Sequence, residues 1–436
     1  MLSFIDPVMY ASTPDNPNTM GMAITLTEPV DGQLLAEAIE ETRERFPYFY
    51  VRPQVEGTDL IVVPNELPMV VRDIWAPTKL ASASVNYHIA AWKFEGKRLA
   101  VEAMHVISDG SGFIPYVKSV LFTYLSRKLG IEFDRTGFKL PGDVIPESEI
   151  GDPFSQEQID AIEAPFYKKA QIKDFAQVKE PDASWRAFCI KLPEKDVIKY
   201  CGELDASPNA LISVLLARAM HRVQPTDDRV ILGGVAVNYK AILGNFDNYR
   251  GFSNLAYISF PPKNLDKDLS LLCTTTRGQI MLQAQPENAL FELKEMKKGM
   301  EMLHSIPSIE AKMLMIGHEA GHKRTSFTVS YANSRSFGPL DPYIEEIYAM
   351  AEPTSSSIVC EITCINHTFF LHFEQCFESE AIFDAFMEEL RAVGISAELI
   401  RKENFQVSSV SYDGLDFSIL NSLLSAVGGL AKMIGA

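Results

Sequence analysis

The segment from residue 88 to residue 125 constrains the fold more than any other part of the chain. Apolar and polar residues alternate on both sides of a Glu-Gly-Lys turn in "HIAAWKFEGKRLAVEAMH", which is typical of a β-hairpin. A polar turn with glycines at 110 and 112 follows, and a helical pattern of apolar residues then begins. The segment therefore predicts two antiparallel strands with a helix packed against them. The apolar stripe of that helix consists of Phe113, Val117, Val120, Leu121, Tyr124 and Leu125.

The other elements predict an α/β chain with mixed sheets, in α+β layers. A helix is expected in "VDGQLLAEAIEETRERFP", and a charged, proline-containing connection with one short helix is expected between about residues 131 and 182. Two further helices are expected over about 267–283 and 290–315. Strands and helices do not strictly alternate along the chain, which disfavours a doubly wound parallel sheet.

The length of the chain predicts two domains. A chain of 436 residues exceeds the size at which one hydrophobic core usually keeps growing, and we expect the division at 1–178 and 179–436. A strand, a short polar turn and a helix recur in "FFLHFEQCFESEAIFDAFMEEL", where Glu374 takes the place of His105 and Glu378 that of Asp109. Two related halves would produce this internal similarity. Chance would also produce it, because strand–turn–helix units are common.

The composition excludes several classes of partner. The 40 basic and 57 acidic residues give a formal net charge of -17, which argues against nucleic acid and against an anionic membrane surface. No apolar run is long enough to span a bilayer, and the N-terminus lacks the basic region of a signal peptide. The six cysteines are scattered without a CxxC pair, which favours reduced thiols. We expect a cytoplasmic, monomeric protein.

A histidine and an aspartate at the end of the hairpin are the first candidates for chemistry. Strand alternation places His105 on the face of Leu99, Val101 and Ala103, so its ring is expected to point into the interior. The glycines that follow Asp109 allow a turn through conformations closed to other residues. A neutral imidazole can take a proton from a hydroxyl near neutral pH. The residues alone leave two interpretations open: a general base, or a core histidine beside a helix-capping aspartate.

The motif His105-x-x-x-Asp109-Gly110 resembles the HxxxDG signature of the chloramphenicol-acetyltransferase-like superfamily. This superfamily includes BAHD acyltransferases, alcohol acetyltransferases and the condensation domains of peptide synthetases. The resemblance extends to "VDGQLLAEAIEETRERFPYFYVRP", to "SPNALISVLLARAMHRV" and to "VILGGVAVNYKAIL". The alcohol-acetyltransferase-like group is the most similar, because Met104 stands where condensation domains carry a further histidine.

The resemblance implies two similar domains that form a pseudo-dimer with a tunnel between them. His105 would act as the general base on an alcohol acceptor, which attacks an acyl thioester of coenzyme A or of a carrier protein. Coenzyme A would be a co-substrate, with no bound cofactor. Amide formation on an amine acceptor is the alternative reaction. A non-catalytic member that binds an acyl chain or a partner is the alternative class.

The same resemblance assigns supporting residues to the site. Asp109, grouped with His105 as a candidate catalytic residue, would hold the site together, with Gly110 beside it. The family pairs this aspartate with an arginine, and the matching position here holds Lys240, so an Asp109–Lys240 ion pair is expected. Candidates for stabilising the oxyanion or for positioning the acceptor are Ser330, Asn333 and Asn254. Exposed turn positions are the alternative for these three residues.

Three further features have less specific interpretations. The sequence His318-Glu319-Ala320-Gly321-His322 fits the HExxH pattern of zinc proteases, but its glycines disfavour a helix, so we expect a loop and no metal. Lys294, Lys297 and Lys298 form either a patch for coenzyme A phosphates or a solvated helix face. The apolar positions between 417 and 434 predict a helix that docks on its own domain, with a partner or membrane helix as the alternative.

Overall fold

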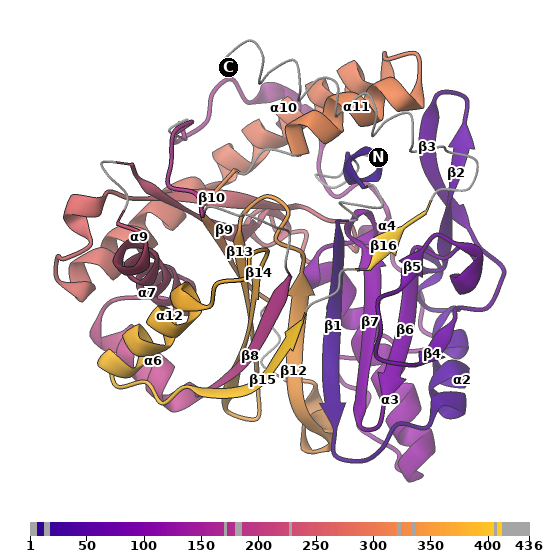
Figure 1. The fold of residues 1–436 in the computed structure, drawn as a ribbon. Helices are drawn as coiled ribbons and strands as arrows, with labels where there is room; N and C mark the ends of the chain where they lie inside the picture. Colours follow the sequence, from indigo (N-terminus) through magenta and orange to yellow (C-terminus); the bar gives the residue numbers. More distant parts are fainter. Residues whose placement is uncertain are drawn as a thin grey trace.

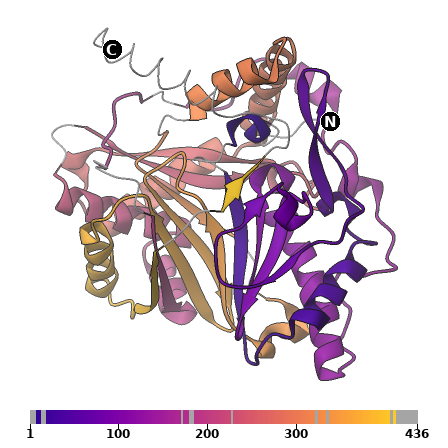
Figure 2. The same cartoon turned by 45° about the vertical axis from the view of Figure 1, so that its right-hand side comes forward.

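The computed structural model describes residues 7–12, 18–169, 172–178, 185–225, 229–320, 324–332, 336–404 and 408–411. Two large mixed sheets lie side by side in this structure, each with helices on its outer face (Figure 1). A view turned by 45° shows the same arrangement, with the helices of the two sheets on opposite sides of the molecule (Figure 2).

The first sheet has the strand order β12-β1-β7-β6-β4 and is antiparallel except between β4 and β6. The predicted hairpin is present, as β6 and β7 joined by a turn at Gly96, whose φ is +58°. The predicted helix is α3, and all six residues of its expected apolar stripe are buried. Helix α2 packs beside it. The bounds are β12 (Ile344–Ala351), β1 (Thr19–Leu26), β7 (Arg98–Met104), β6 (Ala90–Glu95), β4 (Val71–Asp73), α2 (Gly32–Thr42) and α3 (Gly110–Leu129).

The second sheet has seven strands in the order β10-β9-β11-β13-β14-β8-β15. Strand β11 is parallel to both of its neighbours, and the other pairs are antiparallel. Helices cover its outer face around a core of its own (Figure 1). The strands are β10 (Ser253–Phe260), β9 (Ile231–Asn238), β11 (Phe327–Tyr331), β13 (Ile358–Ile365), β14 (Thr368–Gln375), β8 (Arg186–Pro193) and β15 (Glu398–Asn404). The helices are α6 (Glu194–Glu203), α7 (Pro208–Val223), α9 (Leu269–Gln283) and α12 (Ala381–Ala392).

One strand joins the two halves of the chain. β12 lies between β11 and β13 in sequence, yet it pairs with β1 along the edge of the first sheet. It also contacts β13 and β14, so it forms the seam between the two sheets. The fold is therefore α/β with mixed sheets, as predicted. The division of the chain at residue 178 stays a prediction.

The connection between the halves carries two short helices, α4 (Glu147–Ile150) and α5 (Gln156–Ala161), where one was expected. The helix expected over 290–315 is two helices, α10 (Pro286–His304) and α11 (Ile309–Ala320), which lie above the sheets in Figure 1. Helix α11 packs on the short helix α1 (Val8–Ala11). The smaller elements are α8 (Tyr239–Ile242), the hairpin β2 (Val51–Glu56) and β3 (Asp59–Pro64), the pair β5 (Lys79–Leu80) and β16 (Ser409–Val410), and the 3₁₀ turns η1 (Pro47–Phe49), η2 (Ala83–Val85), η3 (His105–Ile107), η4 (Pro262–Asn264) and η5 (Gly338–Tyr343).

The prediction of a loop at the HExxH sequence is wrong for the first three residues of that sequence. Helix α11 continues through Gly317 to Ala320, so His318 and Glu319 have helical backbone. A helical glycine costs only about 1 kcal/mol relative to alanine, so the glycine by itself does not end a helix that also packs on α1. Gly321 and His322 lie outside the described residues. Within the part of the chain that the structure describes, no group of three metal-ligating side chains is placed to hold an ion.

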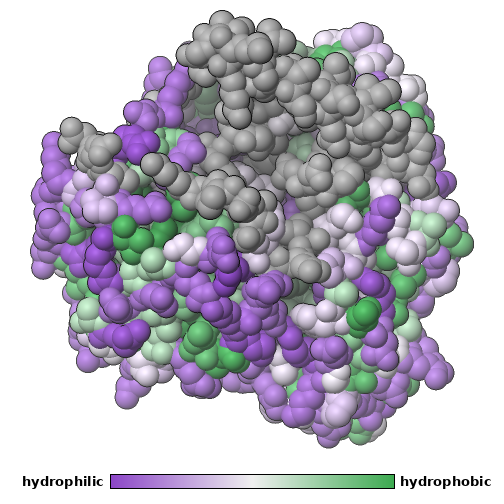
Figure 3. Space-filling model, viewed as in Figure 1, coloured by the Kyte–Doolittle hydropathy of each residue, from purple (hydrophilic) through white to green (hydrophobic). Residues whose placement is uncertain are grey.

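Hydrophilic residues cover most of the described surface on the face seen in Figure 3, with hydrophobic residues in separate areas between them. None of the helices in the described ranges has the length and hydropathy that crossing a lipid bilayer would need. The helix expected near the C-terminus, between 417 and 434, lies outside the described residues.

Candidate active site

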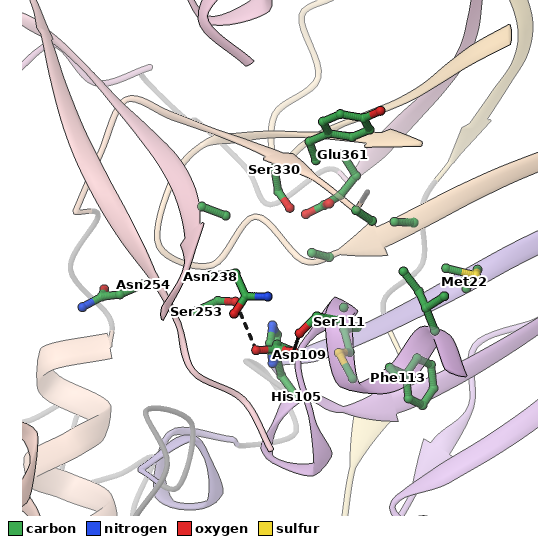
Figure 4. Close-up of a pocket in the computed structure, with 18 of the residues that line it drawn as sticks. Met22, His105, Asp109, Ser111, Phe113, Asn238, Ser253, Asn254, Ser330 and Glu361 are labelled. Atoms are coloured by element: carbon green, nitrogen blue, oxygen red, sulfur yellow. Dashed lines mark hydrogen bonds between the residues drawn. The ribbon is translucent and has the colours of Figure 1, made fainter. Parts of the chain in front are cut away.

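A cavity of about 930 Å³ opens between the two sheets and receives residues from both. Its first wall comes from β1, from η3 and from the start of α3, and includes His105. Its second wall comes from β9, β10, β11 and β13, and includes Ser330 and Glu361. Figure 4 shows Ser330 and Glu361 across the cavity from His105. The volume suits a substrate much larger than a few atoms.

His105 is placed by a turn and not by strand alternation. Strand β7 ends at Met104, and His105 is the first residue of η3, where its backbone N–H donates to the carbonyl oxygen of Asn18 at 2.9 Å. The strand therefore ends one residue before His105, and the direction of the ring relative to the apolar face stays a prediction. The ring lines the cavity and is partly exposed there. Its Nδ1 atom is buried and has no hydrogen-bond partner among the described residues, which leaves Nε2 as the nitrogen for a ligand.

Asp109 is buried and accepts five hydrogen bonds. As the N-cap of α3 it accepts from the backbone N–H of Gly112 at 3.1 Å and from the Ser111 hydroxyl at 2.7 Å. From the second half of the chain it accepts from the backbone N–H of Phe252 at 2.9 Å and from the Ser253 hydroxyl at 3.1 Å. The fifth donor is Lys240. The carboxylate therefore ties the start of α3 to β10.

The expected ion pair between Asp109 and Lys240 is present, with Nζ and Oδ1 3.0 Å apart and both side chains buried. The ammonium group also donates to the carbonyl oxygens of Asn248 at 2.8 Å and Arg250 at 2.7 Å. Burial works against the charge of Asp109, but Lys240 and the other donors hold the pKa of this carboxyl below its usual value. Burial lowers the pKa of Lys240, and Asp109 opposes that shift.

The glycines of the motif act through space and not through backbone conformation. Neither Gly110 nor Gly112 has a positive φ, so the expected turn through restricted conformations is wrong. A Cβ at Gly112 would lie 2.0 Å from the carbonyl oxygen of Tyr249, because two segments of backbone meet there. A Cβ at Gly110 would meet only the Ala332 side chain, at 3.9 Å.

Solved structures share this architecture. TRI101 from F. sporotrichioides, in a structure with coenzyme A and T-2, is 12% identical over 89% of this chain and 98% of its own, with a TM-score of 0.56. Polyketide synthase associated protein 5 from Mycobacterium tuberculosis is 14% identical over 86% of this chain and 93% of its own, with a TM-score of 0.58. The condensation domain of the Monacolin K polyketide synthase MokA is 13% identical over 90% of this chain and 95% of its own, with a TM-score of 0.52.

The chain has the same fold as these solved structures. The similarity spans almost all of the chain, and it is a similarity of fold, since the identities are 12 to 14%. Comparison of the sequence with protein-family models and with curated proteins gives no match.

This fold brings two of the three weaker candidates to the cavity. Ser330 lies on β11, lines the cavity and hydrogen-bonds to Glu361. Asn254 lies on β10 and also lines the cavity, with its amide nitrogen donating to Glu292 at 3.2 Å. Both residues are in strands and not in exposed turns. Asn333 lies outside the described residues.

The three lysines of α10 contact acidic or carbonyl groups instead of lining the cavity. Lys294 donates to the carbonyl oxygens of Asp160 and Ile162 at 3.0 and 2.7 Å. Lys297 lies 3.6 Å from the Asp160 carboxylate, and Lys298 lies 2.7 Å from Glu295.

Two carboxylates of the cavity wall were missed in the sequence. Glu352, directly after β12, accepts from the backbone N–H of Thr19 at 3.2 Å and from its hydroxyl at 2.5 Å. Glu361 lies within β13, where all eight residues are buried. Burial raises the pKa of Glu352 to about 8 and that of Glu361 to about 7. A signal for Glu361 existed: a single charged residue inside the apolar run "SIVCEITCI".

Proposed function

We propose that the protein is an O-acyltransferase that moves an acyl group from a thioester, carried by coenzyme A, to the hydroxyl of an alcohol acceptor. The observation that carries the proposal is the position of His105, whose ring lines a cavity of about 930 Å³ between the two sheets. The fold supports it further, because solved structures of this fold include one with coenzyme A and T-2.

The chemistry follows from the atoms at the site. Nε2 of His105 would take the proton of the acceptor hydroxyl while the oxygen attacks the thioester carbonyl carbon. The tetrahedral intermediate would then collapse, the C–S bond would break, and the imidazolium would return its proton to the departing thiolate. A hydrogen-bond donor on the developing oxyanion would lower the barrier. The hydroxyl of Ser330 in the opposite wall is the candidate, once its single proton turns from Glu361 to the oxyanion.

Asp109 has a positioning role in this proposal. Its two carboxylate oxygens accept hydrogen bonds from five donors, and His105 is not one of these donors. Asp109 and Lys240 would instead fix the first turn of α3 against the second half of the chain, so that η3 presents His105 to the cavity.

The test is turnover of a panel of acyl-CoA thioesters and alcohols by the wild-type protein and by His105→Ala. We expect release of free coenzyme A in the presence of an acceptor, and a loss of about 10²–10⁴-fold in His105→Ala, since a general base contributes that much. Equal rates for the two proteins would overturn the assignment of His105. Running the same assay with acyl groups loaded on a carrier protein separates the two donor classes.

A further inference from the structure

The wall of the cavity opposite His105 contains an acidic side chain in an apolar strand. Glu361 is 8% exposed, and its neighbours Cys360 and Ile362 are at most 1% exposed. Glu361 nevertheless lines the cavity, so its carboxylate reaches the same space as the imidazole (Figure 4). An ionised carboxylate is costly at such a place unless a partner compensates it.

The groups that face Glu361 offer it a hydroxyl and an imidazole that is already paired with another carboxylate. Ser330 on β11 hydrogen-bonds to it. On β14, His372 lies opposite Glu361 in register, but its Nδ1 is 2.6 Å from Glu374, so that imidazole has a carboxylate of its own. Glu352 is held by Thr19. Among the residues that the structure describes, no basic side chain forms an ion pair with Glu361.

We propose that Glu361 determines acceptor specificity by binding a protonated nitrogen, so that the preferred acceptor is an amino alcohol. Its hydroxyl would meet His105 while its ammonium group donates to Glu361 across the cavity. The inference deepens the proposed function and rests on it, because an amino alcohol is an acceptor only if the protein transfers an acyl group to its hydroxyl. A charge-assisted hydrogen bond in a buried site is strong, and a neutral alcohol would leave the carboxylate without a counter-ion.

The ionisation of Glu361 gives the interaction a pH dependence. Burial and the charge of Glu374 raise its pKa to about 7, while Ser330 and His372 oppose the shift. A bound cation favours the ionised carboxylate, so the affinity for an amine should fall as the pH drops below about 7. His105 lines the same cavity and is the proposed general base, so this dependence is measured in the His105→Ala protein.

The first experiment compares two acceptors of one size, 2-amino-1-phenylethanol and 1-phenyl-1,2-ethanediol, with acetyl-CoA at pH 8. We expect the wild-type protein to have a kcat/KM at least about tenfold higher for O-acetylation of the amine, and Glu361→Gln to remove this preference. Glu295→Gln is the matched control, because Glu295 lines the same cavity but is half-exposed and paired with Lys298. It should change the ratio less than about twofold.

The second experiment measures binding without an acyl donor, by calorimetry of 2-amino-1-phenylethanol with His105→Ala. Adding Glu361→Gln should weaken the affinity at least about tenfold and abolish the fall below about pH 7. If the amine binds in this way but wild type consumes no thioester, the proposed function fails and the cation site stands. Equal affinities with and without Glu361→Gln overturn the site even if acyl transfer occurs. Should Glu361→Gln not fold, the pH series on His105→Ala decides by itself: an affinity for the amine that stays level below about pH 7 overturns the site.

Discussion

At the residue scale, Lys240 shows how a lysine can hold the aspartate of this motif. The ammonium group has three N–H donors, and all three are used, on Asp109 and on two backbone carbonyl oxygens. The remaining lone pairs of Asp109 accept from two backbone N–H groups and two hydroxyls. A bidentate guanidinium is therefore not needed to balance the buried charge.

Lys240→Met should strongly destabilise the protein. It leaves Asp109 buried without a counter-ion, which costs about 3–5 kcal/mol. We expect a lower thermal midpoint by calorimetry and a matching loss of acyl transfer. The double variant Asp109→Asn with Lys240→Met removes both charges, so it should be more stable than Lys240→Met alone. A thermal midpoint of Lys240→Met equal to that of wild type would contradict the role given to the pair.

At the element scale, the start of α3 depends on how closely it approaches a loop of the second half. The segment from Asn248 to Phe252 supplies carbonyl oxygens to Lys240 and an N–H to Asp109, and the carbonyl oxygen of Tyr249 accepts from the Ser108 hydroxyl at 2.5 Å. Gly112 allows this approach because it has no Cβ. The helix start is thus one surface of a backbone-to-backbone contact between the two halves.

Two glycine variants separate this contact from helix propensity. Gly112→Ala places a Cβ 2.0 Å from the Tyr249 carbonyl oxygen and should cost about 1–3 kcal/mol through backbone displacement. Gly110→Ala has only Ala332 nearby and should stay within about 1 kcal/mol of wild type, since alanine is the better helix former. Thermal unfolding of the two variants checks the order. Equal stabilities would show that the close approach carries no cost.

At the scale of the whole molecule, β12 makes the two sheets interdependent. This strand comes from the second half of the chain and completes the first sheet by pairing with β1. Directly after β12, the carboxylate of Glu352 accepts hydrogen bonds from the backbone N–H and the hydroxyl of Thr19. A carboxyl group at this seam has been removed from water, which favours its protonated form in the folded protein.

Stability should therefore fall as the pH rises between about 4.5 and 8. The folded-state pKa of Glu352, about 8, lies above its unfolded value, so in this window the folded protein binds more protons than the unfolded chain. Glu352→Gln resembles the protonated form and should have a flatter profile, with its largest gain over wild type near pH 8. Thermal midpoints at pH 5 and pH 8 test this expectation. A wild-type profile as flat as that of the variant would contradict it.

The sequence by itself determined the local elements and the motif. Period-2 and period-3.6 patterns gave β6, β7 and α3, since these depend on neighbouring residues, and the motif resemblance indicated the pairing of Asp109 with Lys240. Only the tertiary structure decided that β12 crosses to the first sheet and that η3, not β7, carries His105. It also showed that Glu361 shares a cavity with His105. The reason is physical. Strand pairing, cavity walls and backbone contacts join residues that are hundreds of positions apart, so the local spacing of apolar residues cannot predict them.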